Sequence, residues 1–121
     1  MVAETRKFTE FEPVDDMLYK ACRVAVESVL AVRNDEKVLI VTNPVKDVFE
    51  ISKGLYDAVV DAGGRPVLVV QPVKSQLDFA EPGVIKAIES EPDVFISVSA
   101  EKLGKDAVSY THLTLPTILL V

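Results

Sequence analysis

The sequence predicts a three-layer α/β domain, with a small parallel sheet built in the order β-α-β-α-β and preceded by an N-terminal helix. Three apolar runs, residues 37–44, 67–71 and 94–99, are rich in Val, Leu and Ile and do not alternate with polar residues. Strands with this pattern are buried on both faces, as in a parallel sheet covered by helices. The segments between them have helical spacing, so we expect two consecutive βαβ units with right-handed crossovers.

The N-terminal part predicts an arm followed by an amphipathic helix. Residues 1–13 mix charges with Phe8 and Phe11 and show no clear period, so we expect the arm to dock through these two rings. Asp15 or Asp16 can cap the helix, which we expect to end near residues 33–34. Its apolar positions recur at helical spacing: Leu18, Ala21, Cys22, Ala25, Val29 and Val32.

Two further helices connect the predicted strands. Asn43 and Pro44 have the order of an N-cap and a first-turn proline, which predicts a helix over residues 45–62. Its buried stripe would contain Val48, Ile51, Leu55, Val59 and Ala62. Gly63 and Gly64 supply a positive-φ stop. After a polar loop over residues 73–81, a short helix begins at Pro82 and is broken by residues 91–93.

Composition excludes several classes of partner. The chain has 13 Lys and Arg against 19 Asp and Glu, and the bases are scattered, which argues against nucleic acid or an anionic membrane as a partner. Its one cysteine, Cys22, cannot form an internal disulfide and is expected to be a small buried residue. No apolar run has the length of a signal peptide core or a membrane span. We therefore expect a cytoplasmic protein.

The last residues differ in character from the rest. Residues 108–121 carry no charge and have no helical period. Residues 109–117 are spelled in order by tct tat aca cat ctg acg ctg ccg acg, and residues 108–117 resemble the in-frame translation of a transposase sequencing adapter. We expect a native domain over residues 1–107 and a non-native tail over residues 108–121; the alternative is an edge strand. The only histidine, His112, lies in this tail and is not expected to be a base or a metal ligand.

Ligands of open parallel sheets gather at the carboxyl ends of the strands. Here those ends offer a weak set of substrate-cleft candidates: Thr42, Asn43, Gln71, Ser97, Ser99 and Glu101. Structural roles compete with this interpretation, because Asn43 has the position of a helix cap. Ser97 and Ser99 share one face of their strand, where small hydroxyls also pack against helices.

The motifs of nucleotide, metal and triad sites are missing. The turn over residues 42–46 has no glycine, and residues 103–106 lack the flanking residues of a P-loop. Asp47, Glu50, Asp57 and Asp61 have the spacing of a solvated helix face rather than of a metal site. Residues 1–107 contain no histidine, so no Ser-His-Asp arrangement is available. We expect no catalytic residue, no metal ligand and no cofactor in this part of the chain.

Three stretches carry a family resemblance: residues 36–42, the helix end at residues 61–64, and residues 92–97. With the leading helix and the Val-rich second strand, they resemble the N-terminal domain of the thermophilic-type leucyl aminopeptidase family, also called aminopeptidase T. The resemblance covers roughly residues 18–106 and implies a hydrolase, a metallopeptidase whose two Zn or Co ions activate water against the N-terminal bond of a peptide substrate. The metal ligands of that family lie in its C-terminal domain and have no counterpart here.

The resemblance therefore implies an inactive N-terminal fragment that contributes one wall of the substrate cleft and a homodimer contact. A non-enzymatic α/β module that binds a small polar ligand at Asn43, Ser97 and Ser99 is the alternative. A third possibility is a domain of another α/β enzyme whose active site lies elsewhere. A sheet of three strands with an exposed final edge is also expected to be marginally stable and prone to edge pairing.

Overall fold

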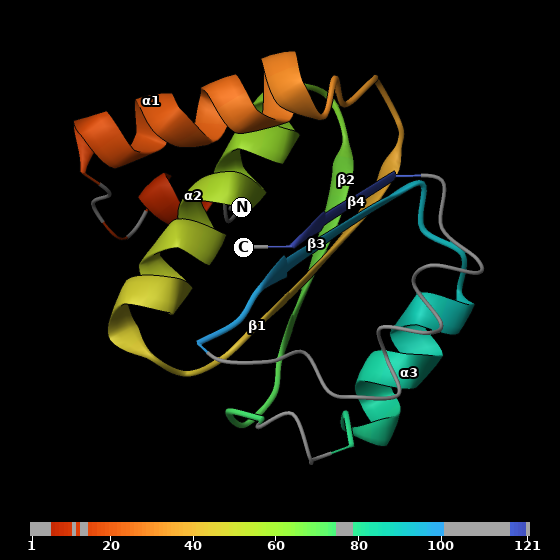
Figure 1. The fold of residues 1–121 in the computed structure, drawn as a ribbon. Coiled ribbons are helices and arrows are strands. Elements are labelled where there is room, and N and C mark those ends of the chain that lie inside the picture. Colours follow the sequence, from red (N-terminus) through yellow and green to blue (C-terminus); the bar gives the residue numbers. More distant parts are fainter. Residues whose placement is uncertain (1–5, 11, 13–14, 75–78, 101–116, 121) are drawn as a thin grey trace, which may run out of the picture.

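The chain folds into a parallel sheet with helices on both faces (Figure 1). The computed structural model describes residues 6–10, 12, 15–74, 79–100 and 117–120. In chain order the elements are the 3-10 turn η1 (Phe8–Glu10), α1 (Asp16–Val24), the π-helical turn η2 (Ala25–Val29), β1 (Lys37–Thr42), α2 (Lys46–Asp61), β2 (Arg65–Val70), α3 (Pro82–Glu89), β3 (Val94–Val98) and β4 (Thr117–Leu120). The predicted α/β class is confirmed.

The strand order is β2-β1-β3-β4, and every neighbouring pair is parallel. β1 is interior, as its continuous apolar run predicts, and Ile40 lies between Leu68 of β2 and Ile96 of β3. The prediction that the third strand forms an exposed edge is wrong, because β4 pairs with β3. β4 falls within the segment expected to be a non-native tail; the origin of that segment stays a prediction.

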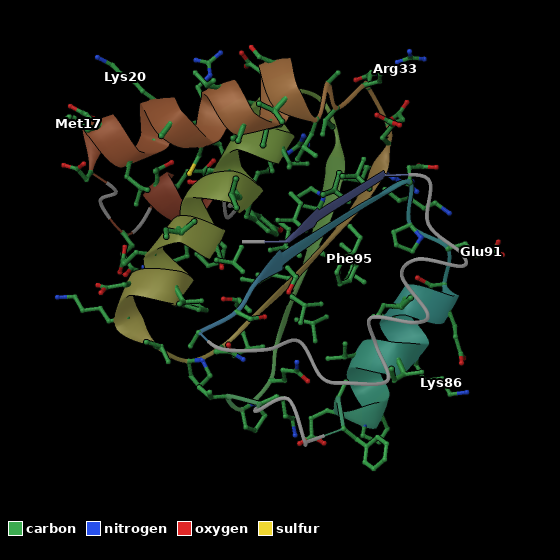
Figure 2. All side chains as sticks on the ribbon, in the orientation of Figure 1. Met17, Lys20, Arg33, Lys86, Glu91 and Phe95 are labelled. Atoms are coloured by element: carbon green, nitrogen blue, oxygen red, sulfur yellow. The ribbon has the colours of Figure 1, made fainter. Side chains whose placement is uncertain are left out.

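Side chains on the two faces of the sheet form two separate apolar clusters. Even-numbered residues of β1 and β3, such as Ile40 and Ile96, pack with α1, η2 and α2. Odd-numbered residues, such as Leu39 and Phe95, pack with Val84 and Ile88 of α3. Figure 2 shows Phe95 on the α3 side of the sheet. Because strand side chains alternate between the two faces, each face of the sheet has its own apolar cluster, covered by one of the two predicted helix layers.

The first helix starts as predicted but ends earlier. Asp15 is the N-cap and accepts a 3.0 Å hydrogen bond from the N–H of Leu18. The predicted end near residues 33–34 is wrong, because α1 gives way to η2 and Ala31 has a φ of 51°. A π-turn contains more residues than an α-turn, so it changes which side chains face the core. Val26, four residues after the buried Cys22, is buried, whereas Val29, which the predicted pattern had placed on the buried face, is 69% exposed.

Cys22 is buried, as expected, and lies against Gly54 of α2. A Cβ built on Gly54 would come within 2.8 Å of the Cys22 sulfur, so only glycine lets α1 and α2 approach this closely. Burial, aided by the negative charge of Asp57, raises the pKa of the Cys22 thiol to about 11. The thiol is therefore neutral at physiological pH and acts as a packing group.

The second helix differs from its prediction at its start. α2 begins at Lys46, its N-cap is Val45, and no side chain caps it. Asn43 is therefore not the cap; its side chain has partners just after β2 and just after β3. The predicted stop is confirmed at Gly63, whose φ is 89°. No helix in the described part of the chain is both long and apolar enough to cross a membrane.

Candidate site at the carboxyl ends of the strands

The carboxyl ends of β1 and β3 form the switch point of this sheet. The chain runs from β1 outward to β2 through α2, then crosses back over β1 through α3 to reach β3. After β1 the chain continues to β2 on one side of it, and after β3 it continues to β4 on the other side, so the strand order reverses between β1 and β3. Open α/β sheets bind ligands at such a point. Thr42, Asn43, Ser97 and Ser99 lie at or just after these strand ends, as the sequence predicts.

Asn43 is buried at this point and links the neighbouring strand ends through hydrogen bonds. Its side chain is fully buried, and its amide nitrogen donates to the carbonyl oxygens of Gln71 at 2.9 Å and Pro72 at 3.3 Å. Its amide oxygen accepts a 2.7 Å bond from the N–H of Ala100. One side chain thus connects the ends of β2 and β3 to the end of β1. We interpret Asn43 as a clamp between strands.

The remaining candidates are hydrogen-bonded within the protein. The Thr42 hydroxyl lies 2.7 Å from that of Ser52 on α2. The hydroxyls of Ser97 and Ser99 lie 2.9 Å apart, which confirms that they share one face. Ser97 is buried and Ser99 is partly exposed, so Ser99 is the hydroxyl that a ligand could reach. Glu101 lies outside the described residues.

A hollow of about 430 Å³ adjoins the carboxyl end of β1. It lies over the start of α2 and is lined by Glu12, Pro44, Val45, Lys46, Phe49, Glu50 and Lys53. Its volume is within the range of small-molecule sites, and its lining carries both signs of charge. Sequence reasoning missed this feature, because its residues come from the arm and from a helix face that was expected to be solvated.

Lys53 lies beneath this hollow and is 2% exposed. Its ammonium group pairs with the carboxylates of Glu12 and Glu50, the latter at 3.0 Å. Burial alone would lower the pKa of Lys53, but the hydrogen bonds and charges of the two carboxylates outweigh it and raise the pKa. A nucleophilic lysine needs a lowered pKa, so Lys53 serves as a charged anchor.

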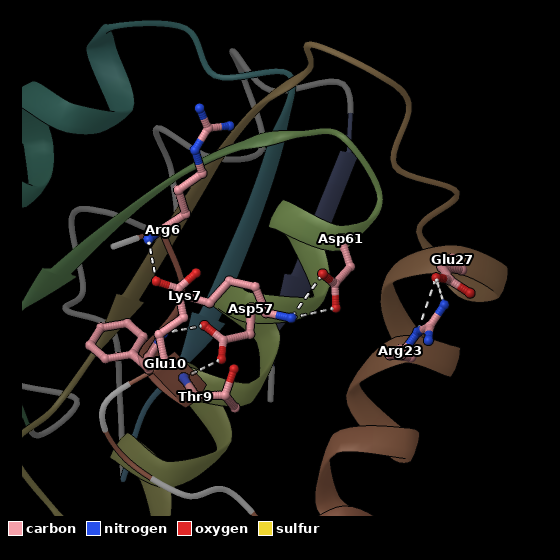
Figure 3. A network of polar contacts seen from close by, with 9 residues as sticks. Arg6, Lys7, Thr9, Glu10, Arg23, Glu27, Asp57 and Asp61 are labelled. Atoms are coloured by element: carbon pink, nitrogen blue, oxygen red, sulfur yellow. Dashed lines mark hydrogen bonds and ion pairs between the residues drawn. The ribbon is translucent and has the colours of Figure 1, made fainter. Parts of the chain in front are cut away.

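The arm is fixed to α2 by a row of polar contacts (Figure 3). Asp57 is fully buried and accepts hydrogen bonds from the N–H groups of Phe8 at 2.8 Å and Thr9 at 2.9 Å. Lys7 pairs with Asp61 at 2.9 Å. Lys53, Asp57 and Asp61 are spaced four residues apart and form one stripe of α2.

Aromatic packing adds to this attachment. The ring of Phe8 meets that of Tyr56 edge to face, with centroids 5.1 Å apart, which confirms the predicted docking through Phe8. Phe11 lies outside the described residues. The prediction of a solvated helix face is wrong for Asp57, which is buried. Asp61 is exposed, as predicted, and Glu50 is half-buried; each of them pairs with a lysine.

The described residues provide limited chemistry. They contain no group of three His, Cys, Asp or Glu side chains that could hold a metal ion, and His112 lies outside them. A two-metal center therefore does not fit the described donor set. The described part of the chain offers a partly exposed hydroxyl at Ser99 and, at the start of α2, a hollow lined by charged side chains, and both can bind a polar group.

Comparisons of the chain with protein-family models, with curated proteins and with solved structures each found no match.

Proposed function

We propose that this chain forms the N-terminal α/β domain of a larger two-metal aminopeptidase and supplies one wall of its peptide-binding cleft. The observation that supports this proposal is the placement of the three stretches that resemble the aminopeptidase T family. Residues 36–42 form β1, residues 61–64 end α2, and residues 92–97 enter β3. All three stretches therefore belong to one β1-α2-β2-α3-β3 unit.

In this proposal the chain has no catalytic residue of its own. The described donor set does not fit a metal pair, so the ligands for two Zn or Co ions would come from a C-terminal domain. The carboxyl ends of β1 and β3 would face that domain, because ligands bind at this edge of a parallel sheet. Ser99 and the charged hollow beside Lys53 would then contact the peptide.

The test compares the 121-residue chain with the product of the complete reading frame from the source DNA. Both are incubated with Zn²⁺ or Co²⁺ and an aminoacyl chromogenic substrate, and release of the N-terminal residue is measured with and without a chelator. We expect metal-dependent release by the complete product and none by the 121-residue chain. A complete product that binds metal and releases no amino acid would refute the proposal.

A second candidate is a non-enzymatic module that binds a small polar ligand. The charged hollow of about 430 Å³ next to the switch point favors it. Calorimetry of the 121-residue chain against amino acids, nucleotides and organic acids, without added metal, tests this candidate. We expect heat of binding that Lys46→Ala in the hollow weakens and that Lys20→Ala on α1 leaves unchanged. A flat response across the panel would exclude it.

A further inference from the structure

An apolar hollow of about 390 Å³ lies at the amino ends of β1 and β2, on the face of the sheet that α3 covers. It is separate from the charged hollow, which adjoins the opposite, carboxyl end of β1. α3 has only eight residues and packs through Val84 and Ile88 over β1 and β3. The amino half of β2 therefore stays uncovered, and Val67 is 59% exposed there.

The lining of this hollow combines aliphatic walls with two cations. The aliphatic side chains come from β1, β2, α3 and the turn before β3: Leu39, Val67, Ala87 and Pro92. The cations are Lys37 and Arg65, which are the first residues of β1 and β2. The positive charge thus lies at one end of the hollow, beside an apolar surface.

Lys37 and Arg65 are partners in the parallel register of β1 and β2, where neighboring strands are about 4.8 Å apart. Alternate residues share a face, so both cations lie on the same face as Leu39 and Val67. Neither cation forms an ion pair within the described part of the chain. The carboxylate of Asp93 accepts a 2.9 Å hydrogen bond from the backbone N–H of Lys37 instead. Two like charges at this spacing repel one another, and an anion between them would remove the repulsion.

We propose that this hollow binds a carboxylate with an aliphatic chain, of the class of medium-chain fatty acids. The carboxylate lies between Lys37 and Arg65, whose guanidinium group can donate two parallel hydrogen bonds to it, and the chain covers Leu39 and Val67. Inorganic phosphate has no apolar part and leaves Val67 exposed, whereas a neutral alkane leaves the two cations unpaired. The volume is within the range of small-molecule sites. This binding does not depend on the proposed peptidase role, because the hollow lies at the other end of the strands.

Heteronuclear NMR of the 121-residue chain during titration with sodium octanoate tests the site. We expect saturable shifts of the amide signals of Val67 and Ala87, and none at Phe49 in the charged hollow. Affinity should rise from butanoate to hexanoate to octanoate, by up to about fourfold for each buried methylene. The absence of saturable shifts, a response centered on Phe49, or equal binding of the three acids would overturn the proposal.

Substitutions in the same titration test the two cations and the walls. Arg65→Gln and, separately, Lys37→Gln should each raise the dissociation constant for octanoate about fivefold, the loss expected for one exposed ion pair. Ala87→Leu should abolish binding, because the larger side chain fills the hollow. Lys20→Gln is the matched control, since Lys20 is an exposed lysine of α1 on the other face of the sheet (Figure 2). Circular dichroism verifies that each variant is folded.

Octylammonium, which has the same chain and the opposite charge, separates charge recognition from apolar adsorption. We expect it to bind more weakly than octanoate, because the two cations repel it. Octylammonium that binds as tightly as octanoate would overturn the proposal. So would a Lys20→Gln variant that loses as much affinity as Arg65→Gln.

Discussion

Replacement of Asn43 by alanine tests whether this side chain holds the three strand ends together. The substitution removes donors to the carbonyls of Gln71 and Pro72 and the acceptor for the N–H of Ala100. These groups differ in their access to water: Gln71 is 2% exposed, whereas Pro72 and Ala100 are exposed. The loss should therefore be largest at the Gln71 carbonyl.

The expected cost follows from that difference. A buried carbonyl left without a partner costs about 2 kcal/mol, and losing the two bonds to groups that water can reach costs about 0.5 kcal/mol each. We expect the free energy of unfolding to fall by about 3 kcal/mol. For a domain of this size that corresponds to a fall in Tm of about 12 °C.

Urea unfolding followed by circular dichroism measures this loss, and Asn43→Asp provides a second readout. The carboxylate keeps the acceptor for Ala100 but faces two carbonyl oxygens, so the folded state should raise its pKa. A raised carboxyl pKa means that the stability of this variant falls as pH rises through about 4 and above. A loss below about 1 kcal/mol in Asn43→Ala would refute the clamp. So would an Asn43→Asp variant as stable as wild type at pH 7.

Three other substitutions test the arm, the buried lysine and the stop of α2. Asp57→Ala should cost about 2 kcal/mol and speed amide exchange in the arm, since two N–H groups lose a buried acceptor. Asp47→Ala, in the exposed first turn of α2, should cost at most about 1 kcal/mol through the helix dipole and leave exchange in the arm unchanged; slow exchange in Asp57→Ala would contradict this. The pKa of Lys53 is raised by folding, so its pairing stabilizes fully below the unfolded value of about 10.4 and is lost as pH rises through the folded value. Lys53→Met should flatten that part of the stability curve, and a curve parallel to wild type would show that pairing contributes nothing. Gly63→Ala, at a φ of 89°, should lower the free energy of unfolding by about 1–2 kcal/mol, while Gly83→Ala, whose added Cβ meets nothing within 4 Å, should not lower it. Equal melting temperatures of the two variants would show that an alanine at Gly63 causes no backbone strain.

Apolar runs and breakers were enough to predict the layers of the fold. The runs that form β1 and β3 have no polar alternation, and both strands are interior. Gly63 and Pro82 mark a helix end and a helix start that the structure reproduces. These features are local, so a single sequence contains them.

The features that failed depend on long-range partners. Asp57 has the spacing of a solvated face, yet it is buried, because the arm, more than 40 positions earlier in the chain, covers it. The same arm pairs with the buried Lys53, which the sequence did not single out. Asn43 precedes a proline, as a helix cap often does, but its side-chain amide instead makes hydrogen bonds to three backbone groups that follow β2 and β3. The π-turn over Ala25–Val29 changes which side chains of the first helix face the core, and no residue type in this stretch predicts such a turn.

The proposal that this chain is one domain of a longer metallo-aminopeptidase can be decided by a long sequencing read of the source DNA across the codons for residues 105–121. We expect the genomic frame to leave the adapter-like sequence after residue 107 and to continue into a region with clustered His, Glu and Asp codons. A genomic frame that encodes residues 108–121 as printed and then stops would contradict it. In that case a small binding protein would be the better account of the charged hollow.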